Sequence, residues 1–154
     1  MTVRKTPEGT RGARPMPRLA GKLMQPLMMR IHRRSKDRFS GMNLLYLTTV
    51  GARSGERRTV PVARFDDGAG GWYVVASAGG TARHPAWYYN LVAHPDQVWA
   101  EVSGTRRQVA VDQLAGEARD RAWDQVVREA PRFGSYPDKT DRELPVLRLT
   151  PAEG

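Results

Sequence analysis

Arginine, serine and glycine are concentrated in one turn of this chain, residues 51–58. Its polar side chains include those of Arg53, Ser54 and Arg58. Glycine lets backbone N–H groups converge on a ligand, and a guanidinium binds phosphate or carboxylate through two parallel N–H donors. The turn therefore predicts an anion-binding site at the end of a hairpin. A solvated, arginine-rich turn is the alternative interpretation, and the turn alone does not decide between the two.

Small residues predict a second part of a binding site. Residues 76–80 end a predicted strand with alanine, serine and glycine, so a planar ring can approach their backbone closely. Pro61 has no N–H for a strand ladder, which predicts that it lies at an edge or a bulge, where neighbouring backbone groups can face a ligand. Trp87 and Leu91 lie on one face of a predicted helix. A core position is the favoured interpretation of Trp87, and contact with a ring is the alternative.

The chain is poor in acid–base machinery. Its histidines, His32, His84 and His94, have no metal-site spacing, and the last two each precede a proline, which favours a capping role. Ser54 and Ser77 have no nucleophile elbow or dedicated base. No glycine pattern matches a dinucleotide or phosphate-binding loop. This profile is typical of a protein whose cofactor carries the reactive atom.

Composition and charge divide the chain in two. The net charge of +9 is carried by residues 1–40, which hold 11 Lys or Arg against Glu8 and Asp37, whereas residues 41–154 balance 14 against 14. The 154 residues contain no cysteine, and no apolar run reaches the roughly 18 residues of a membrane span. Because the sequence shows no apolar region and cleavage site typical of a secretory signal, we expect a cytoplasmic protein.

The basic N-terminal part is predicted to have two sections. Residues 1–17 are rich in proline, glycine and charge, which predicts disorder. Residues 18–40 are expected to hold a basic amphipathic helix, with its apolar stripe within 18–34. Packing of that helix on the domain is favoured, and contact with an anionic membrane surface is the alternative.

Residues 41–154 are predicted to form one mainly-β domain with flanking helices. The expected strands are 43–50, 59–65, 72–77, 97–103, 105–113 and 144–149, the expected helices are 84–93 and 117–129, and 66–71 and 131–139 are read as a turn and a loop. Asp66, Asp67, Asp138 and Asp141 are read as turn residues. Because alternating βαβ order is missing, the pattern predicts a closed or half-open antiparallel barrel with room at its mouth for one flat ligand.

Several motifs, in order, resemble the deazaflavin-dependent nitroreductase family. They are Thr48–Thr49–x–Gly51–x–x–Ser54–Gly55–x–x–Arg58–x–x–Pro61, Ala76–Ser77–x–Gly79–Gly80, Pro85–x–Trp87–Tyr88–x–Asn90–Leu91, His94–Pro95 and Thr140–Asp141–Arg142–x–x–Pro145–Val146. The resemblance covers roughly residues 19–151. It implies a split β-barrel that binds coenzyme F420 and passes hydride from the reduced form, F420H2, to quinones, nitroaromatics or activated alkenes.

The resemblance also implies a set of cofactor contacts. Arg53, Ser54 and Arg58 would hold the phosphate and acidic tail, the backbone at Val60, Pro61 and Val62 would meet the pyrimidine end, and Ala76, Ser77, Ala78 and Gly79 would border the ring. Trp87 and Asn90 would fix the helix beneath the site, with Asn90 as a structural hydrogen bonder.

Two residues are the implied catalytic donors, Ser77 and Tyr136. Ser77 would donate a hydrogen bond to a substrate oxygen as negative charge develops. The chain departs from the better-known relatives at Ala78, where they carry a lysine, and at Phe133, where a phenol is absent. These departures put nitroimidazole reduction in doubt and leave Tyr136 as the phenol of that loop.

Three classes of function remain. The first is an F420H2-dependent reductase of quinones or nitro compounds, either monomeric or a homodimer. The second is a non-catalytic F420 carrier or an FMN-binding barrel. The third is a nucleic-acid or anionic-lipid binder acting through residues 1–40. It ranks last, and no nucleic acid is expected, because Phe39 is the one aromatic residue in that segment.

Overall fold

The computed structural model describes residues 3–13, 38–39 and 42–152. The described strands form one eight-stranded sheet. They are β1 (Arg38–Phe39), β2 (Met42–Val50), β3 (Arg57–Ala63), β4 (Phe65–Asp66), β5 (Trp72–Val75), β6 (Trp99–Val102), β7 (Thr105–Gln113) and β8 (Val146–Pro151). The helices are α2 (Ala86–Ala93), α3 (Gly116–Glu129) and α4 (Tyr136–Lys139), with 3₁₀ turns η1 (Ala78–Gly80) and η2 (Pro131–Ser135).

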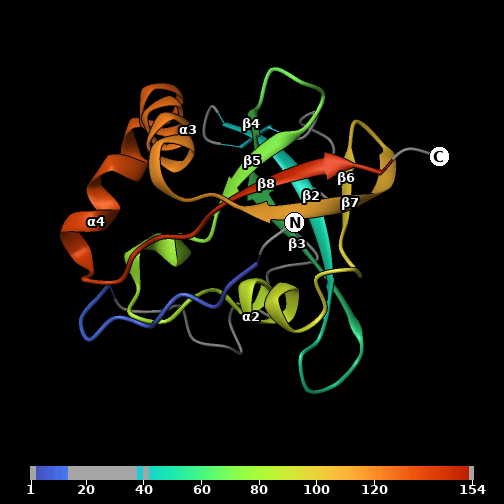
Figure 1. The fold of residues 1–154 in the computed structure, drawn as a ribbon, viewed down its shortest axis with the longest axis horizontal. Coiled ribbons are helices and arrows are strands. Elements are labelled where there is room, and N and C mark those ends of the chain that lie inside the picture. The colour runs from blue at the N-terminus through green and yellow to red at the C-terminus, as the bar shows by residue number, and fades with distance from the viewer. Residues whose placement is uncertain (1–2, 14–37, 40–41, 153–154) are drawn as a thin grey trace.

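The sheet is antiparallel throughout and curls into a split barrel (Figure 1). The strand order is β1-β2-β6-β7-β8-β5-β4, and β3 pairs with β2 as a hairpin from Leu44–Ala63 to Val50–Arg57. β3 also contacts β5, but among the described strands its ladder is with β2 alone. The barrel therefore stays open between β3 and β5, which is the half-open one of the two predicted forms.

Two apolar clusters hold this arrangement. The barrel interior is filled by fully buried side chains of strands and α2, including Leu45, Leu47, Val74, Leu91, Val98, Val111, Leu147 and Leu149. The second cluster packs α3 and η2 on the outer side of β5 and β8 through Phe65, Val75, Ala122, Val126, Phe133 and Val146. Because residues of one strand alternate between faces, β5 and β8 contribute to both clusters.

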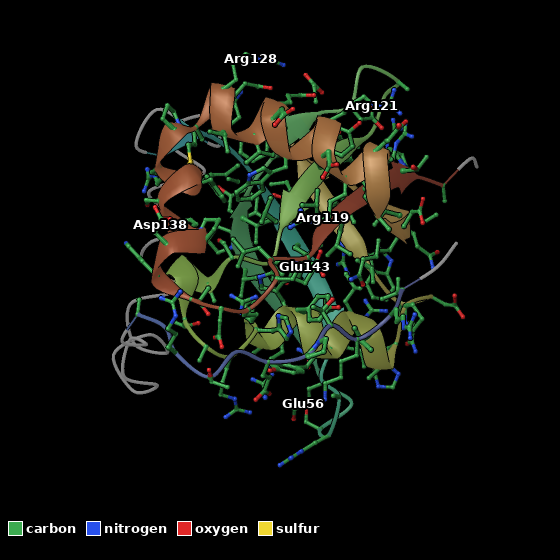
Figure 2. All side chains as sticks on the ribbon, turned by 60° about the vertical axis from the view of Figure 1, so that its left-hand side comes forward. Glu56, Arg119, Arg121, Arg128, Asp138 and Glu143 are labelled. Carbon is green, nitrogen blue, oxygen red and sulfur yellow. The ribbon has the colours of Figure 1, made fainter. Side chains whose placement is uncertain are left out.

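Helix α3 is amphipathic, as its sequence predicts. Ala122 and Val126 are buried, while Arg121 and Arg128 are exposed on its outward side (Figure 2). Arg119 fastens the helix to the segment before β8: it donates to the Leu144 carbonyl at 2.8 Å and lies 3.5 Å from the Glu143 carboxylate.

The predicted loop 131–139 is wrong, because this segment forms η2 and α4. Pro131 occupies the first turn of η2, where the missing N–H costs no hydrogen bond. Phe133 is 6% exposed and meets the Phe65 ring edge-on at 5.7 Å. A single buried aromatic thus fixes a segment whose prolines, glycine and serine are typical of loops.

Several strand and helix ends also differ from the prediction. β3 begins at Arg57 rather than at residue 59, because the Gly51 N–H donates to the Glu56 carbonyl and shortens the turn. β5 ends at Val75, before the chain turns into η1. Asp67 is the turn residue that was predicted, since its carboxylate accepts the Ala69 and Gly71 N–H groups.

Residues 3–13, which we call the N-terminal strap, were predicted to be disordered but form an extended segment that crosses beside α2 and approaches α4 (Figure 1). Thr6 is buried, and its N–H donates to the Tyr88 hydroxyl at 3.1 Å. Further along, the Gly9 N–H donates to the Ala82 carbonyl and the Ala13 N–H to the Gly80 carbonyl. The prediction of disorder from proline and glycine content is therefore wrong for residues 3–13, because hydrogen bonds to residues distant in the sequence order the strap.

The predicted helix 18–34 lies outside the described residues. At the end of the 18–40 segment, Arg38–Phe39 form β1 rather than helix. Among the residues that the structure describes, no helix is both long enough and apolar enough to span a bilayer.

Candidate functional site

A cavity of about 280 Å³ opens at the split between β3 and β5. Its walls come from β2, β3, the β5–η1 connection, the start of α2, and η2. They are lined by Met42, Leu44, Pro61, Val62, Ala63, Val75, Ser77, Ala78, Gly79, Pro85, Trp87 and Phe133. Apolar and aromatic side chains predominate, and Ser77 is the lining residue with a hydroxyl. Such a cavity suits a flat, largely apolar group.

β3 supplies one wall as an edge strand. Pro61 opposes Tyr46 in the ladder and has no N–H to donate, which is tolerated because β3 is at an edge. The predicted edge position of Pro61 is confirmed. Val62 also lines the cavity, whereas Val60 is half-buried against the barrel core outside the lining.

The opposite wall is a backbone rim, residues 76–81, with an uncommon conformation. Ala78, Gly79 and Gly80 follow one another with φ values of 46°, 64° and 82°. A Cβ on Gly79 would have no described neighbour within 4 Å, so the space in front of it is open. Ser77 begins η1 without a side-chain capping bond. Ala76, predicted to border a ring, is the first residue of the rim, but it is fully buried and does not line the cavity.

Arg142 holds the rim from behind, and sequence reasoning missed it. The residue is buried, and its guanidinium donates to the carbonyls of Ala76 (2.8 Å), Ser77 (2.6 Å) and Thr81 (3.0 Å). Burial lowers the pKa of Arg142. In the sequence, Arg142 was noticeable only as part of the Thr140–Asp141–Arg142 motif, and that motif alone indicated no role for the side chain.

His84 extends this network, so its predicted capping role is wrong. Pro85, not His84, is the N-cap residue of α2, and the His84 ring is buried. Nδ1 lies 2.8 Å from a guanidinium nitrogen of Arg142, which can only donate, so Nδ1 accepts and Nε2–H donates to the Thr6 carbonyl at 2.6 Å. Burial is the main cause that lowers the pKa of His84. His94 does cap α2, through its backbone N–H.

Helix α2 connects the cavity to the arginine-rich hairpin. Trp87 is 9% exposed and packs in the barrel core, so its favoured core position is confirmed; it also lines the cavity, and its contact with a ring stays a prediction. The Asn90 side chain accepts from the Ala52 N–H at 3.0 Å and donates to Thr49 Oγ1 at 3.3 Å. Asn90 is thus the structural hydrogen bonder that was predicted, and it fixes the base of the turn.

The hairpin tip carries the predicted anion-binding residues outside the cavity. Arg53, Ser54 and Arg58 are exposed, and Glu56 lies at the far end of the hairpin, away from α3 (Figure 2). Ser54 Oγ accepts the Glu56 N–H at 3.2 Å, and Arg58 pairs with the Glu56 carboxylate at 3.1 Å. Arg58 is three residues from Pro61, about 10 Å along an extended strand.

The two predicted catalytic side chains are placed differently. Ser77 lines the cavity, but Tyr136 does not. The Tyr136 ring lies 5.2 Å from that of Phe133, which occupies the lining position. Tyr136 therefore lies outside the cavity lining, next to the Phe133 ring.

The described geometry can be compared with known proteins. The family model for F420H(2)-dependent quinone reductase matches residues 23–151. The chain belongs to this family. An F420H(2)-dependent quinone reductase of Mycobacterium tuberculosis is 38% identical over 110 residues, 69% of this chain and 72% of that protein.

Solved structures agree with the family. The F420-H2 dependent reductase FDR-A has a TM-score of 0.62 and 36% identity, covering 69% of this chain and 92% of that one. A protein solved as a domain-swapped dimer has a TM-score of 0.63 and 30% identity, covering 80% and 96%. The split-barrel prediction is confirmed. As a member of the F420H2-dependent quinone reductase family, the chain is an oxidoreductase that depends on reduced F420.

Proposed function

We propose that this chain binds F420H2 with its deazaflavin ring in the cavity between β3 and β5, and that a quinone is the hydride acceptor. The observation that carries the proposal is that residues far apart in the sequence, implied by the resemblance to contact the deazaflavin or to support it from beneath, line this one cavity. They are Pro61, Val62, Ser77, Ala78, Gly79 and Trp87.

The residues present fit such a cofactor. Open space in front of Gly79 and the apolar wall at Val62 admit a planar ring against the backbone. Outside the cavity, Arg53 and Arg58 offer guanidinium donors for the phosphate and acidic tail. A ring in the cavity with its tail extending along β3 toward the hairpin uses both regions.

Bound F420H2 supplies the hydride. The protein aligns the donor and acceptor, and the apolar lining excludes water. Ser77 donates a hydrogen bond to the acceptor oxygen on which negative charge develops. Arg58 exchanges its Glu56 partner for an anionic group of the cofactor. Tyr136 is a proposed donor that first requires a shift of Phe133, so we rank Ser77 above it.

Quinones are the favoured acceptors because the lining is apolar and aromatic on the side of Phe133. Nitroaromatics are the second class to test. Self-association is a further proposal, supported by the relative that was solved as a domain-swapped dimer. Sedimentation velocity tests it through the mass of the particle. A cytoplasmic location and membrane contact by residues 18–40 stay predictions.

The test is turnover combined with cofactor titration. Purified protein mixed with F420H2 and menadione is expected to oxidise the cofactor, and F420 is expected to bind more tightly than FMN. Arg58→Gln should weaken F420 binding, whereas Arg128→Gln, on the exposed side of α3, is the matched control and should not. Binding without turnover across a panel of quinones, nitro compounds and enones favours a carrier. Tighter FMN binding contradicts the proposal.

A further inference from the structure

The rim that borders the cavity does not hold its own shape. Ala78, Gly79 and Gly80 adopt three consecutive left-handed conformations, and Ala78 has a Cβ that disfavours this region. Inside the rim the hydrogen bonds are those of one 3₁₀ turn, from the Gly80 N–H to the Ser77 carbonyl and from the Thr81 N–H to the Ala78 carbonyl. A conformation of this kind persists when surrounding groups fix it.

We propose that Arg142 is a positioning residue for the cofactor ring, which sets residues 76–81 by holding the carbonyls of Ala76, Ser77 and Thr81 from behind the cavity. This inference rests on the proposed function and adds a specific residue to it. Arg142 is outside the described lining of the cavity, so its effect on the ring is transmitted through the rim.

The bonding of Arg142 is directed at the rim. Its Nη1, Nη2 and Nε each donate to one of the three carbonyls, and Nη1 also meets His84 Nδ1. Within the described part of the chain, no carboxylate is paired with this buried guanidinium. Burying a cation against neutral dipoles is costly, so a simple gain in stability does not account for it. A lysine ammonium lacks the planar fork that reaches three separated carbonyls.

The N-terminal strap closes the outer side of the same junction. The strap bonds to the carbonyls of Gly80 and Ala82, and a Cβ on Gly12 would clash with the Ala82 backbone nitrogen. His84 joins Arg142 to the Thr6 carbonyl. The Asp141 carboxylate accepts hydrogen bonds from Thr10 and Arg11. Arg142 therefore bonds directly to the rim and reaches the strap through His84.

Arg142→Lys in the full chain is the direct test, with Arg148→Lys as its matched control. Arg148 is close to Arg142 in the sequence and lies in β8, but it pairs with Asp67, which does not line the cavity. We expect Arg142→Lys to raise the Kd of F420 and the KM for F420H2 about tenfold. The KM for menadione and the kcat at saturating F420H2 should stay within about twofold. Arg148→Lys should change none of these, and Val111→Ala, a core variant, separates lost stability from lost positioning.

Hydrogen exchange gives a readout that does not need the cofactor. In Arg142→Lys the amides of Gly80, Thr81 and Ala13 should exchange about tenfold faster, while those of the β5–β8 ladder stay unchanged. Another outcome is that the unchanged protein fails to bind F420 while these amides still exchange faster in Arg142→Lys. In that case the proposed function fails and the rim-setting role of Arg142 stands. A folded Arg142→Lys variant with unchanged F420 affinity and unchanged rim exchange overturns the inference.

A second measurement uses the unchanged protein and is needed if the Arg142→Lys variant does not fold. In the unchanged protein, F420 should slow exchange at Gly80 and Thr81 and also at Gly9 and Ala13, because the strap bonds to the Gly80 carbonyl in the rim and to the Ala82 carbonyl just after it. Slowing at both places supports the inference. Bound F420 that leaves the rim amides unaffected contradicts it.

Discussion

The hydroxyl of Ser77 is the polar side-chain group best placed to act on a substrate in the cavity. The backbone carbonyl of Ser77, rather than its hydroxyl, is the group that Arg142 engages, and the hydroxyl does not cap η1. The Ser77 carbonyl therefore holds the residue in place, whereas its hydroxyl is the group that can donate to a substrate. A substitution at Ser77 can remove the donor while the rim stays in place.

Ser77→Ala should lower kcat/KM for a quinone about tenfold, because one hydrogen bond to the developing oxyanion is lost. The Kd of F420 should change by less than about twofold, since the rim backbone is retained. Steady-state kinetics with menadione and fluorescence titration measure the two effects. Ser135→Ala removes a hydroxyl whose bond is local, to the Arg132 carbonyl, and serves as control. Equal activity of the two variants would show that Ser77 is not the donor.

At the hairpin tip, Glu56 would compete with the cofactor for Arg58 if the proposed position of the acidic tail is correct. Their side chains pair at 3.1 Å and are 70% and 54% exposed, so the pair is weak in water. Glu56→Gln should tighten F420 binding about two- to threefold at low ionic strength, and salt should diminish the gain. The measurement is a titration at several salt concentrations, with Asp124→Asn on α3 as the control. Weaker binding by Glu56→Gln would place the anionic tail elsewhere.

At the scale of elements, a helix or strand could be predicted where its own sequence pattern determines it, but not where contacts with distant residues stabilise it. β7 was predicted residue for residue, because Gly104 makes the turn and the buried Val109 and Val111 alternate with exposed residues. The segment 131–139 was read as a loop because its local composition favours one. Its helical turns are fixed by one buried aromatic, Phe133, against a residue far away in the sequence. Such a contact leaves no periodic signal.

Phe133→Ala should therefore destabilise the protein by about 3 kcal/mol, the usual cost of truncating a buried aromatic. The side chain is 6% exposed and contacts both Phe65 and Tyr136. Urea unfolding measures the change, and Phe133→Leu, which refills most of the volume, should lose much less. A Phe133→Ala variant as stable as the unchanged protein would mean that η2 is held by other contacts.

The strap makes stability depend on pH through His84. Burial lowers the pKa of His84 below its ordinary value of 6.5, and a protonated ring would face the Arg142 guanidinium, with Glu8 as the nearby opposite charge. The unfolded chain then binds more protons, so the stabilisation is fully present above pH 6.5 and is lost as pH falls through the lower folded pKa.

Urea midpoints should fall between about pH 7.5 and about pH 5, and His84→Asn should flatten that slope. The Asp141 carboxylate, which binds the strap, has its pKa lowered to about 2, first by its hydrogen bond from Thr10. Its contribution is present above its ordinary pKa of 3.8 and is lost only as pH falls through about 2, outside this range. A midpoint that does not change between the two pH values would contradict the role of His84.

At the scale of the whole molecule, the β2–β3 hairpin connects the cavity to the arginine-rich turn, with cavity-lining residues such as Leu44 and Ala63 at one end and the turn at the other. The fold class and much of the cavity could be predicted, because Pro61 and the small residues 76–80 carry their own backbone signal. Arg142 and His84 could not, since a buried cation held by carbonyls looks like any other arginine in the sequence. The strap was missed for the same reason: its partners, such as Tyr88 and Asp141, are distant in the chain.

The crystal structure of the full chain with F420 tests the central claim most directly. We predict that the deazaflavin ring lies between β3 and the 76–81 rim, in contact with Val62 and Gly79, with its acidic tail extending toward Arg58. A ring bound outside this cavity, or a tail that leaves the hairpin arginines uncontacted, would contradict it.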